Sequence, residues 1–232
     1  MPGFQDGQWW VQNFSAYLPT LLFGDLTGRR VLDLCAAPGG KTASLIQQGA
    51  IVTALDVSET RMARLRESLD RLGFEAELIV ADVLDYMPAA PFDAVLLDAP
   101  CSATGTVRRH PDVLYLKSGE QINQLAALQA KMLDRVVDFV APGGTVIYCT
   151  CSLEPEEGEK QMNSFLARHD TLDRVPIKAE EVFQQEDWLT VDGDLRLLPF
   201  HSPVSSYEAN PLLDELAGLD GFFISRFRIK AA

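Results

Sequence analysis

The sequence predicts an α/β protein with a doubly wound, mostly parallel sheet, because short apolar segments alternate with segments of helical length. The apolar segments are rich in Val, Ile and Leu, as is typical of strands covered on both faces. Right-handed crossovers place the carboxyl ends of such strands at one edge of the sheet, where ligands bind. The expected strands are residues 30–35, 51–57, 76–81, 93–97 and 145–149.

Segments of helical length separate the expected strands. The first follows a pair of glycines, and the second begins at Ser58, a favourable N-cap residue, and ends before Gly73. Pro155 and the glutamates after it predict a further helix, because acidic side chains stabilise the positive end of a helix. A last strand and an apolar, aromatic-rich lead-in complete the chain. These elements are expected at residues 41–48, 58–72 and 120–140, from about 155, and at 222–229 and 6–22.

Length and composition predict one domain, residues 1–232, in which residues 1–28 pack on the core as a lead-in segment. The chain is 47% hydrophobic, which is enough for a substantial core. No apolar run approaches the roughly 18 residues that cross a bilayer, and the first residues do not resemble a signal peptide. We therefore expect a cytoplasmic protein without a membrane partner. Four cysteines without C-x-x-C spacing predict free thiols.

The chain has a formal net charge of −13, from 33 acidic and 20 basic residues. Nucleic-acid-binding proteins usually present a basic surface, so this charge counts against such a partner. The conflict eases if basic residues gather at one rim, or if a further binding segment lies outside the chain. The histidines, His110, His169 and His201, show no ligand spacing with one another or with the cysteines, and we expect no metal.

A glycine turn after the first strand predicts a cofactor site. Small residues and two glycines let the backbone turn sharply and bring its N–H groups to a ligand at the next helix N-terminus. The turn resembles half of a phosphate loop, but Leu34 and Cys35 stand where that motif has its first glycine, which disfavours nucleotide hydrolysis. The expected cofactor-binding residues are Cys35, Ala36, Ala37, Pro38, Gly39, Gly40 and Lys41.

Aspartates follow the next three expected strands. Asp56, Asp82 and Asp98 would all emerge at the sheet edge that carries the glycine turn. An acidic residue after the second strand typically accepts hydrogen bonds from ribose hydroxyls, and Asp82 is placed to accept one from an adenine amino group. Each aspartate alone reads equally well as a loop residue or a helix cap. Three in register favour a bound cofactor.

Two cysteines follow strand ends in turn-like contexts. Cys101 lies in the sequence Asp-Ala-Pro-Cys-Ser, and Cys151 lies in Thr-Cys-Ser. An isolated cysteine is most often a small buried hydrophobic residue, which is how we interpret Cys35 and Cys149. Because a helix is expected to begin near Pro155, its N-terminus would lower the pKa of the Cys151 thiol and favour the nucleophilic thiolate.

Together these motifs resemble the Sun/RsmB family of RNA cytosine-5 methyltransferases. The resemblance rests on residues 33–42, on residues 98–112 and on the Thr-Cys-Ser motif with its trailing glutamates, and it runs from about Gly3 to Lys230. The Arg-Arg-His-Pro-Asp stretch is most similar to the bacterial RsmB branch, whose members methylate small-subunit ribosomal RNA. The resemblance implies a Rossmann-like fold with an antiparallel C-terminal strand, S-adenosylmethionine as cofactor, and RNA, here 16S ribosomal RNA, as substrate.

The resemblance also implies a covalent mechanism. Cytosine C5 is too electron-poor to attack a methyl sulfonium directly, whereas addition of a thiolate at C6 makes C5 strongly nucleophilic. In the family the cysteine of Thr-Cys-Ser attacks C6, which makes Cys151 the expected nucleophile, and the Pro-Cys cysteine, here Cys101, assists breakdown of the adduct. Asp98 would border both the cofactor and the target base. Residues expected to contact the substrate are Lys41, Pro100, Arg108 and Arg109.

The chain departs from the family at two positions: Asn13 stands where many relatives have Asp, and Tyr115 where some have Trp. RsmB proteins usually carry an RNA-binding N-terminal domain, and we expect that domain to be absent from this chain. We expect a monomer.

Two other functions stay open, a methyltransferase acting on DNA or protein and a catalytically silent RNA-binding or ribosome-assembly module. No Asn-Pro-Pro-Tyr motif for amino-group methylation is present, and the two cysteines with three strand-end aspartates favour turnover.

Overall fold

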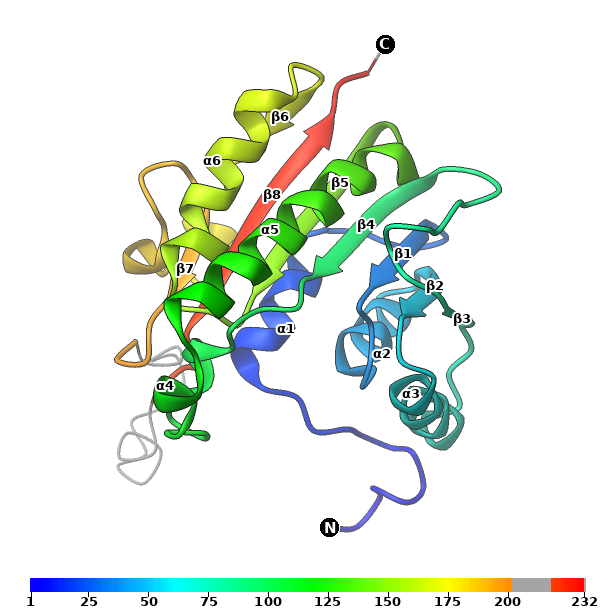
Figure 1. Ribbon diagram of the computed structural model, residues 1–232. Coiled ribbons are helices and arrows are strands. Elements are labelled where there is room, and N and C mark those ends of the chain that lie inside the picture. The colour runs from blue at the N-terminus through cyan, green and yellow to red at the C-terminus, as the bar shows by residue number, and fades with distance from the viewer. Residues whose placement is uncertain (202–217, 232) are drawn as a thin grey trace.

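The computed structural model describes residues 1–201 and 218–231, which form one eight-stranded sheet with helices on both faces (Figure 1). The strand order is β3-β2-β1-β4-β5-β8-β6, and β7 also pairs with β8. Strands β1 to β5 are parallel, whereas β8 runs antiparallel to β5, β6 and β7. The strands are β1 (Arg30–Leu34), β2 (Ile51–Asp56), β3 (Glu77–Val80), β4 (Phe92–Asp98), β5 (Val140–Thr150), β6 (Leu172–Arg174), β7 (Leu195–Leu197) and β8 (Phe222–Ile229).

The longer helices divide between the two faces of the sheet. In Figure 1, α5 and α6 cross in front of β4, β5 and β8, while α1, α2 and α3 pack on the opposite face. Short 3-10 turns occur at residues 104–106, 137–139, 155–157, 179–182 and 186–188. The α-helices are α1 (Phe14–Leu21), α2 (Gly40–Gln47), α3 (Glu59–Leu72), α4 (Val113–Leu116), α5 (Gly119–Val136) and α6 (Glu159–Arg168).

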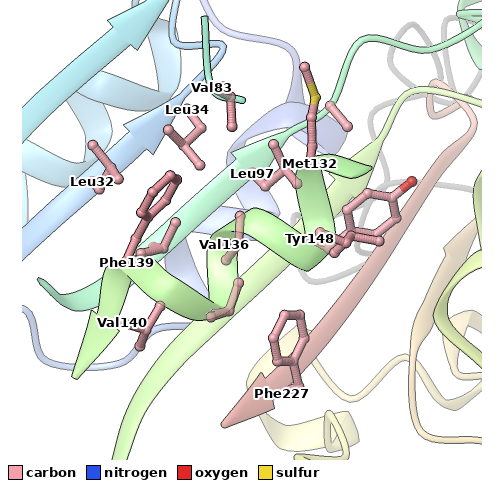
Figure 2. Packing of buried hydrophobic residues seen from close by; sticks show 14 of the residues in the cluster. Leu32, Leu34, Val83, Leu97, Met132, Val136, Phe139, Val140, Tyr148 and Phe227 are labelled. Atoms are coloured by element: carbon pink, nitrogen blue, oxygen red, sulfur yellow. The ribbon is translucent and has the colours of Figure 1, made fainter. Parts of the chain in front are cut away.

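Two hydrophobic layers enclose the sheet because successive residues of a strand point to opposite faces. Leu97 of β4 joins a buried cluster with Tyr148 of β5 and Met132 of α5, as Figure 2 shows. Its neighbour Leu96 joins the second cluster, together with Leu18 of α1. Complete burial of one such side chain contributes about 1.5–3 kcal/mol to folding. Packing on both faces therefore stabilises the sheet, and a functional site can lie at the ends of its strands and in the loops.

The predicted fold class is confirmed: the sheet is mostly parallel, doubly wound, and ends in an antiparallel strand. The expected limits of α3 also hold, since the hydroxyl of Ser58 accepts a hydrogen bond from the N–H of Arg61 and Gly73 adopts a φ of 67° at the C-cap. The lead-in contributes Leu18 and Leu22 to the core. No helix within residues 1–201 or 218–231 is both long and apolar enough to cross a membrane.

Several expected boundaries are wrong. The helix predicted for residues 120–140 ends at Val136, and after a 3-10 turn the chain enters β5 at Val140, five residues before the expected strand. Strand β3 is not covered on both faces, because it lies at the edge of the sheet and each of its residues stays at least partly exposed. The helix expected from Pro155 is a 3-10 turn there, and α6 begins only at Glu159.

A carboxyl group is buried inside the sheet at Asp33 of β1, which is 0% exposed. Its Oδ2 atom accepts a hydrogen bond from the Thr42 hydroxyl at 2.6 Å, while Oδ1 has no hydrogen-bond partner among the described residues. Burial raises the pKa of Asp33 to about 7, against the lowering effect of the Thr42 hydroxyl. The ionised form of Asp33 is therefore disfavoured in the folded protein.

We expect Asp33→Asn to change how stability depends on pH. Because the pKa of Asp33 rises from 3.8 to about 7 on folding, the wild type loses stability as pH increases through this window. The free energy of unfolding of the variant, relative to wild type, should rise by about 1–3 kcal/mol between about pH 5 and pH 8. Urea titrations at both pH values measure this difference, and equal differences would contradict the assignment.

Candidate active site

The carboxyl ends of β1, β2, β4 and β5 meet at one edge of the sheet and carry the candidate site. Parallel pairing puts Asp98, the last residue of β4, level with Cys149 of β5. Cys101 and Cys151 follow these two residues in the turns beyond the strands. On the other side of β1, Asp56 ends β2 level with Val80 of β3. The expected aspartates and cysteines thus emerge on one edge, as the parallel topology requires.

A cavity of about 390 Å³ opens at this edge of the sheet. Seven of the predicted site residues line it, and they include Cys101, Cys151 and all three strand-end aspartates. Apolar side chains from α5, among them Met132, form part of its wall. A cavity with apolar walls and a few convergent polar groups is typical of small-molecule sites. The predicted residues in the wall are Cys35, Asp56, Asp82, Asp98, Pro100, Cys101 and Cys151.

The glycine turn between β1 and α2 has the strained geometry expected of a close approach to a ligand. Cys35 adopts a φ of 59°, which is uncommon for any residue other than glycine. Gly39 has a φ of 102° at the N-cap of α2, and a Cβ atom there would lie 2.9 Å from Cγ of Leu65. Ala36, Ala37, Pro38, Gly39 and Gly40 do not line the cavity, but they shape the turn behind it.

Asp56 is fixed in place by backbone groups on both sides of it. Its carboxylate accepts hydrogen bonds from the N–H of Ala37 at 3.2 Å and from the N–H of Ser58 at 3.0 Å. The guanidinium of Arg61 lies 3.4 Å from the same carboxylate and also donates to the carbonyl of Ala37. Only 1% of Asp56 is exposed, yet the residue reaches the cavity wall. The arrangement joins the glycine turn to the end of β2 and gives a rigid acceptor for hydroxyl groups.

Lys41 and Asp98 form an ion pair beside the cavity. The Nζ atom of Lys41 lies 2.7 Å from Oδ2 of Asp98, and the lysine side chain is only 11% exposed. Burial on its own would lower the pKa of Lys41, but the carboxylate of Asp98 outweighs burial and raises it. Lys41 is therefore held as a cation. Its prediction as a cofactor-binding and substrate-binding residue is untested, since it does not line the cavity itself.

Cys101 and Cys151, two of the three cysteines in the cavity wall, are hydrogen-bonded to each other, with their Sγ atoms 3.5 Å apart. This bond lowers the pKa of the Cys151 thiol below its ordinary value, although burial acts in the opposite direction. The same bond, together with burial, raises the pKa of Cys101 well above its ordinary value. Cys101 is therefore the protonated donor and Cys151 the group that ionises first. Among the nearby charges, Asp98 raises the pKa of Cys151 and Lys41 lowers it.

The sequence suggested that a helix N-terminus lowers the pKa of Cys151, and this explanation is wrong. α6 begins at Glu159, eight residues beyond Cys151, and only a 3-10 turn lies at Pro155. The lowered pKa of Cys151 instead comes first from the hydrogen bond of Cys101. Cys149 is fully buried, as expected, and its thiol donates to Asp98 at 3.4 Å. Burial also raises the pKa of Cys35.

A close contact between two glycines holds the backbone of Cys151. The N–H of Gly105 donates to the carbonyl of Cys151 at 3.0 Å, and the N–H of Gly221 donates to the carbonyl of Gly105 at 2.8 Å. A Cβ atom on Gly105 would lie 2.0 Å from the carbonyl oxygen of Gly221. Neither backbone can retreat from such a contact, so residue 105 must be glycine.

The remaining predicted residues lie outside the cavity wall. Arg109 binds the carboxylate of Asp220 with its Nε and Nη2 atoms, at 2.9 and 2.6 Å, and half of its side chain is exposed. Arg108 donates to the carbonyl of Gly218. Among residues 1–201 and 218–231, no group of His, Cys, Asp or Glu could hold a metal ion.

The two positions that depart from the family pattern have different surroundings. Asn13 is the N-cap of α1, where its side chain accepts a hydrogen bond from the N–H of Ala16, a role that Asp performs equally well. Tyr115 is 90% exposed on α4. The substitution at Asn13 therefore keeps the local structure, and the one at Tyr115 changes an exposed ring.

Sequence reasoning missed two residues of the site, Arg61 and Glu157. Arg61 lies in the first turn of α3, shortly after Asp56 at the end of β2, and this position is the signal that could have found it. The sequence placed Glu157 only among the acidic residues at a helix start, whereas the structure buries it completely, at 0% exposed. No pattern in the sequence distinguishes it from its partly exposed neighbour Glu156.

A sequence profile described as "16S rRNA methyltransferase RsmB/F" matches residues 23–228. The chain belongs to the RsmB/F family. It is 47% identical over 176 residues to ribosomal RNA small subunit methyltransferase B of Erwinia tasmaniensis, a match that covers 73% of this chain and 41% of the relative. The protein of the same name from Vibrio cholerae is 42% identical over 173 residues, or 72% of this chain and 40% of the relative. The chain thus spans about two fifths of these RsmB/F relatives.

Solved structures agree with this assignment. A methyltransferase homologue from Pyrococcus horikoshii has a TM-score of 0.75 and 28% identity, covering 99% of this chain and 70% of the other. The structure titled "NSun6 from Pyrococcus horikoshii with SFG" has a TM-score of 0.78 at 22% identity, covers 100% of this chain and 56% of the other, and supports the fold alone. The resemblance inferred from the motifs is confirmed for the RsmB/F family, as is the Rossmann-like methyltransferase fold.

Substitution of Cys101 tests whether its hydrogen bond lowers the pKa of Cys151. Replacing Cys101 by Ala removes the hydrogen bond that lowers the pKa of Cys151, so we expect Cys151 to require a higher pH for alkylation. Replacing Cys101 by Ser keeps a hydroxyl donor and should leave the pH profile closer to that of the wild type. Iodoacetamide labelling followed by mass spectrometry measures the reaction at Cys151. An identical profile in wild type and Cys101→Ala would exclude this hydrogen bond as the cause.

Proposed function

We propose that this chain is the catalytic part of an S-adenosylmethionine-dependent RNA methyltransferase that modifies C5 of a cytosine in 16S ribosomal RNA. One observation carries the proposal: the Cys101–Cys151 pair lies in the wall of the same cavity as the strand-end aspartates. A nucleophile and a cofactor site are thereby within reach of one bound base. Membership of the RsmB/F family supports the same reaction.

The residues of the cavity fit S-adenosylmethionine. Asp56 is held rigidly at the end of β2, where an acidic residue accepts hydrogen bonds from ribose hydroxyls, and Asp82 lies beyond β3 on the side expected for adenine. The strained backbone at Cys35 turns towards the same cavity and would hold the methionine part. When bound, this cofactor supplies an electrophilic methyl group on sulfonium sulfur. The methyltransferase fold supports this cofactor.

The thiol pair provides what the reaction at cytosine requires. The thiolate of Cys151 forms a bond to C6, and the electron pair displaced towards C5 makes that carbon able to accept the methyl group. C5 takes the methyl group and the sulfonium donor leaves as a neutral thioether. The C5 proton then passes to water, its bonding electrons re-form the C5–C6 double bond, and the C6–Sγ bond breaks, which restores the thiolate of Cys151. Cys101, with its sulfur 3.5 Å away, lies next to the bond that must break. Asp98, held by Lys41, lines the cavity between the two turns and would border the base.

The target base must be unpaired to reach the cavity, because both faces of its C5–C6 bond have to be accessible. Arg108 and Arg109 lie just beyond the turn that carries Cys101, where they would contact phosphates. With a net charge of −13, the chain has little general attraction for RNA. We therefore expect part of the RNA affinity to come from the region of the relatives that this chain does not span.

Substitution of the two cysteines tests the mechanism. We expect Cys151→Ser to abolish methyl transfer, because a hydroxyl is a far weaker nucleophile than a thiolate at neutral pH. Cys101→Ser should keep the attack but slow the release, so that a covalent protein–RNA adduct appears as a slow band in a denaturing gel. Incorporation of labelled methyl groups into small-subunit RNA measures the first effect. Full activity of Cys151→Ser would refute this nucleophile, and activity on DNA or protein instead of RNA would favour the alternative substrates.

The proposed cofactor site is tested at Asp56. We expect Asp56→Asn to weaken binding of S-adenosylmethionine about tenfold to a hundredfold, because a charge-assisted hydrogen bond contributes about 1.5–3 kcal/mol. Asp70→Asn, on the exposed side of α3, is the matched control and should bind as the wild type does. Isothermal titration calorimetry measures both. Equal affinities for the two variants would exclude Asp56 from the cofactor site, and no binding by the wild type would favour a silent module.

A further inference from the structure

A buried glutamate connects the two turns that carry the cysteines. Glu157 ends the 3-10 turn after Cys151, and its side chain is 0% exposed although it has no cationic partner among the described residues. Burial of an unpaired carboxylate costs several kcal/mol unless hydrogen bonds satisfy it. Its position beside the turn of Cys101 suggests that it acts on the thiol pair.

The carboxylate of Glu157 is satisfied by three donors. The backbone N–H of Ser102 lies 2.9 and 3.1 Å from its two oxygens, and the Ser102 hydroxyl donates to Oε2 at 2.5 Å. The Nε2 atom of Gln129, on α5, donates to Oε1 at 3.0 Å. Ser102 is the residue directly after Cys101. Glu157 therefore anchors the backbone of the Cys101 turn.

The same network reaches the Cys151 turn. The hydroxyls of Ser102 and Ser152 lie 3.0 Å apart, so the residues that follow the two cysteines are hydrogen-bonded to each other. Gln129 also donates to the carbonyl of Pro100 at 2.9 Å, on the other side of Cys101. The turn that carries Cys101 and the turn that carries Cys151 are therefore joined by one buried network of hydrogen bonds.

We propose that Glu157 is a positioning residue that sets the separation of the Cys101 and Cys151 sulfur atoms and keeps the shared proton on Cys101. Its hydrogen bonds to Ser102 and Gln129 fix the turn, and its negative charge raises the pKa of Cys101, while the cation of Lys41 lowers the pKa of Cys151. The charges of Glu157 and Lys41 therefore both favour ionisation of Cys151 over Cys101. The inference rests on the proposed role of Cys151 as nucleophile.

The substitution Glu157→Gln tests this inference, with Glu156→Gln as the matched control. Glu156 is the neighbouring glutamate of the same 3-10 turn, but its side chain is 36% exposed and pairs with Lys160. The first readout is the pH dependence of iodoacetamide labelling at Cys101 and Cys151, followed by mass spectrometry. We expect the two pH profiles to move towards each other in Glu157→Gln, because the charge that disfavours ionisation of Cys101 is gone. The control should keep the wild-type separation.

The second readout is steady-state methyl transfer. We expect kcat of Glu157→Gln to fall about tenfold to a hundredfold with little change in KM for S-adenosylmethionine, because misplacement of the sulfurs affects the chemical step and not cofactor binding. A folded Glu157→Gln protein with wild-type labelling profiles and wild-type kcat would overturn the proposal. Should this variant fail to fold, Ser102→Ala loosens the same anchor and keeps the charge; an unchanged kcat in that variant would also overturn it.

The labelling needs no RNA, so its outcome is independent of the proposed function. If Cys151→Ser retained methyl transfer, the nucleophile assignment would fail while the coupling of Glu157 to the thiol pair could still be measured. If Cys151→Ser were inactive and Glu157→Gln behaved as wild type in both readouts, only the positioning role would fail.

Discussion

The register between β4 and β5 is the constraint on which the site depends. Because these strands are parallel and pair Asp98 with Cys149, the turns beyond them leave the sheet together and bring the sulfur atoms of Cys101 and Cys151 to 3.5 Å. A slip of one residue would invert every side chain of a strand and separate the pair. The two hydrophobic layers prevent such a slip, since Leu97 and Leu96 fit opposite faces. Packing of the core therefore fixes the geometry of the chemistry.

The charged side chains near the thiol pair are largely shielded from solvent. Lys41 is held as a cation by Asp98, and both groups lie close enough to Cys151 to affect its ionisation. Removing one partner of such a buried pair leaves an uncompensated charge, which destabilises a protein more than the pair stabilises it. The two charges act in opposite directions on Cys151, since Asp98 raises the pKa of its thiol and Lys41 lowers it. Burial raises the pKa of Asp33 to about 7, so this carboxyl group is only partly ionised near neutral pH.

Much of the fold could be predicted from the sequence, because β1 to β5 and β8 each have an apolar run, and the glycine turn and Ser58 mark the starts of helices. The three-residue strands β6 and β7 have no such run and were not predicted. The strand-end aspartates could be predicted too, since parallel topology sends every carboxyl end to the same edge. The limits of β5 could not, because Pro142 and two glycines read as a loop yet lie within the strand. Burial of Glu157 was also beyond the sequence, because its three donors come from distant segments. The cause of the lowered pKa of Cys151 could not be found either, since it depends on the distance to another thiol.

The contact between Gly105 and Gly221 links the turn that carries Cys151 to the residue just before β8, 70 positions beyond Cys151 in the chain. The position of the Cys151 carbonyl therefore depends on Gly105, and through it on the start of the last strand. For a protein engineer, this means that the C-terminal strand cannot be trimmed or exchanged as a passive edge. A graft at β8 must keep glycine at position 221, or the contact with Gly105 that holds the carbonyl of Cys151 is lost.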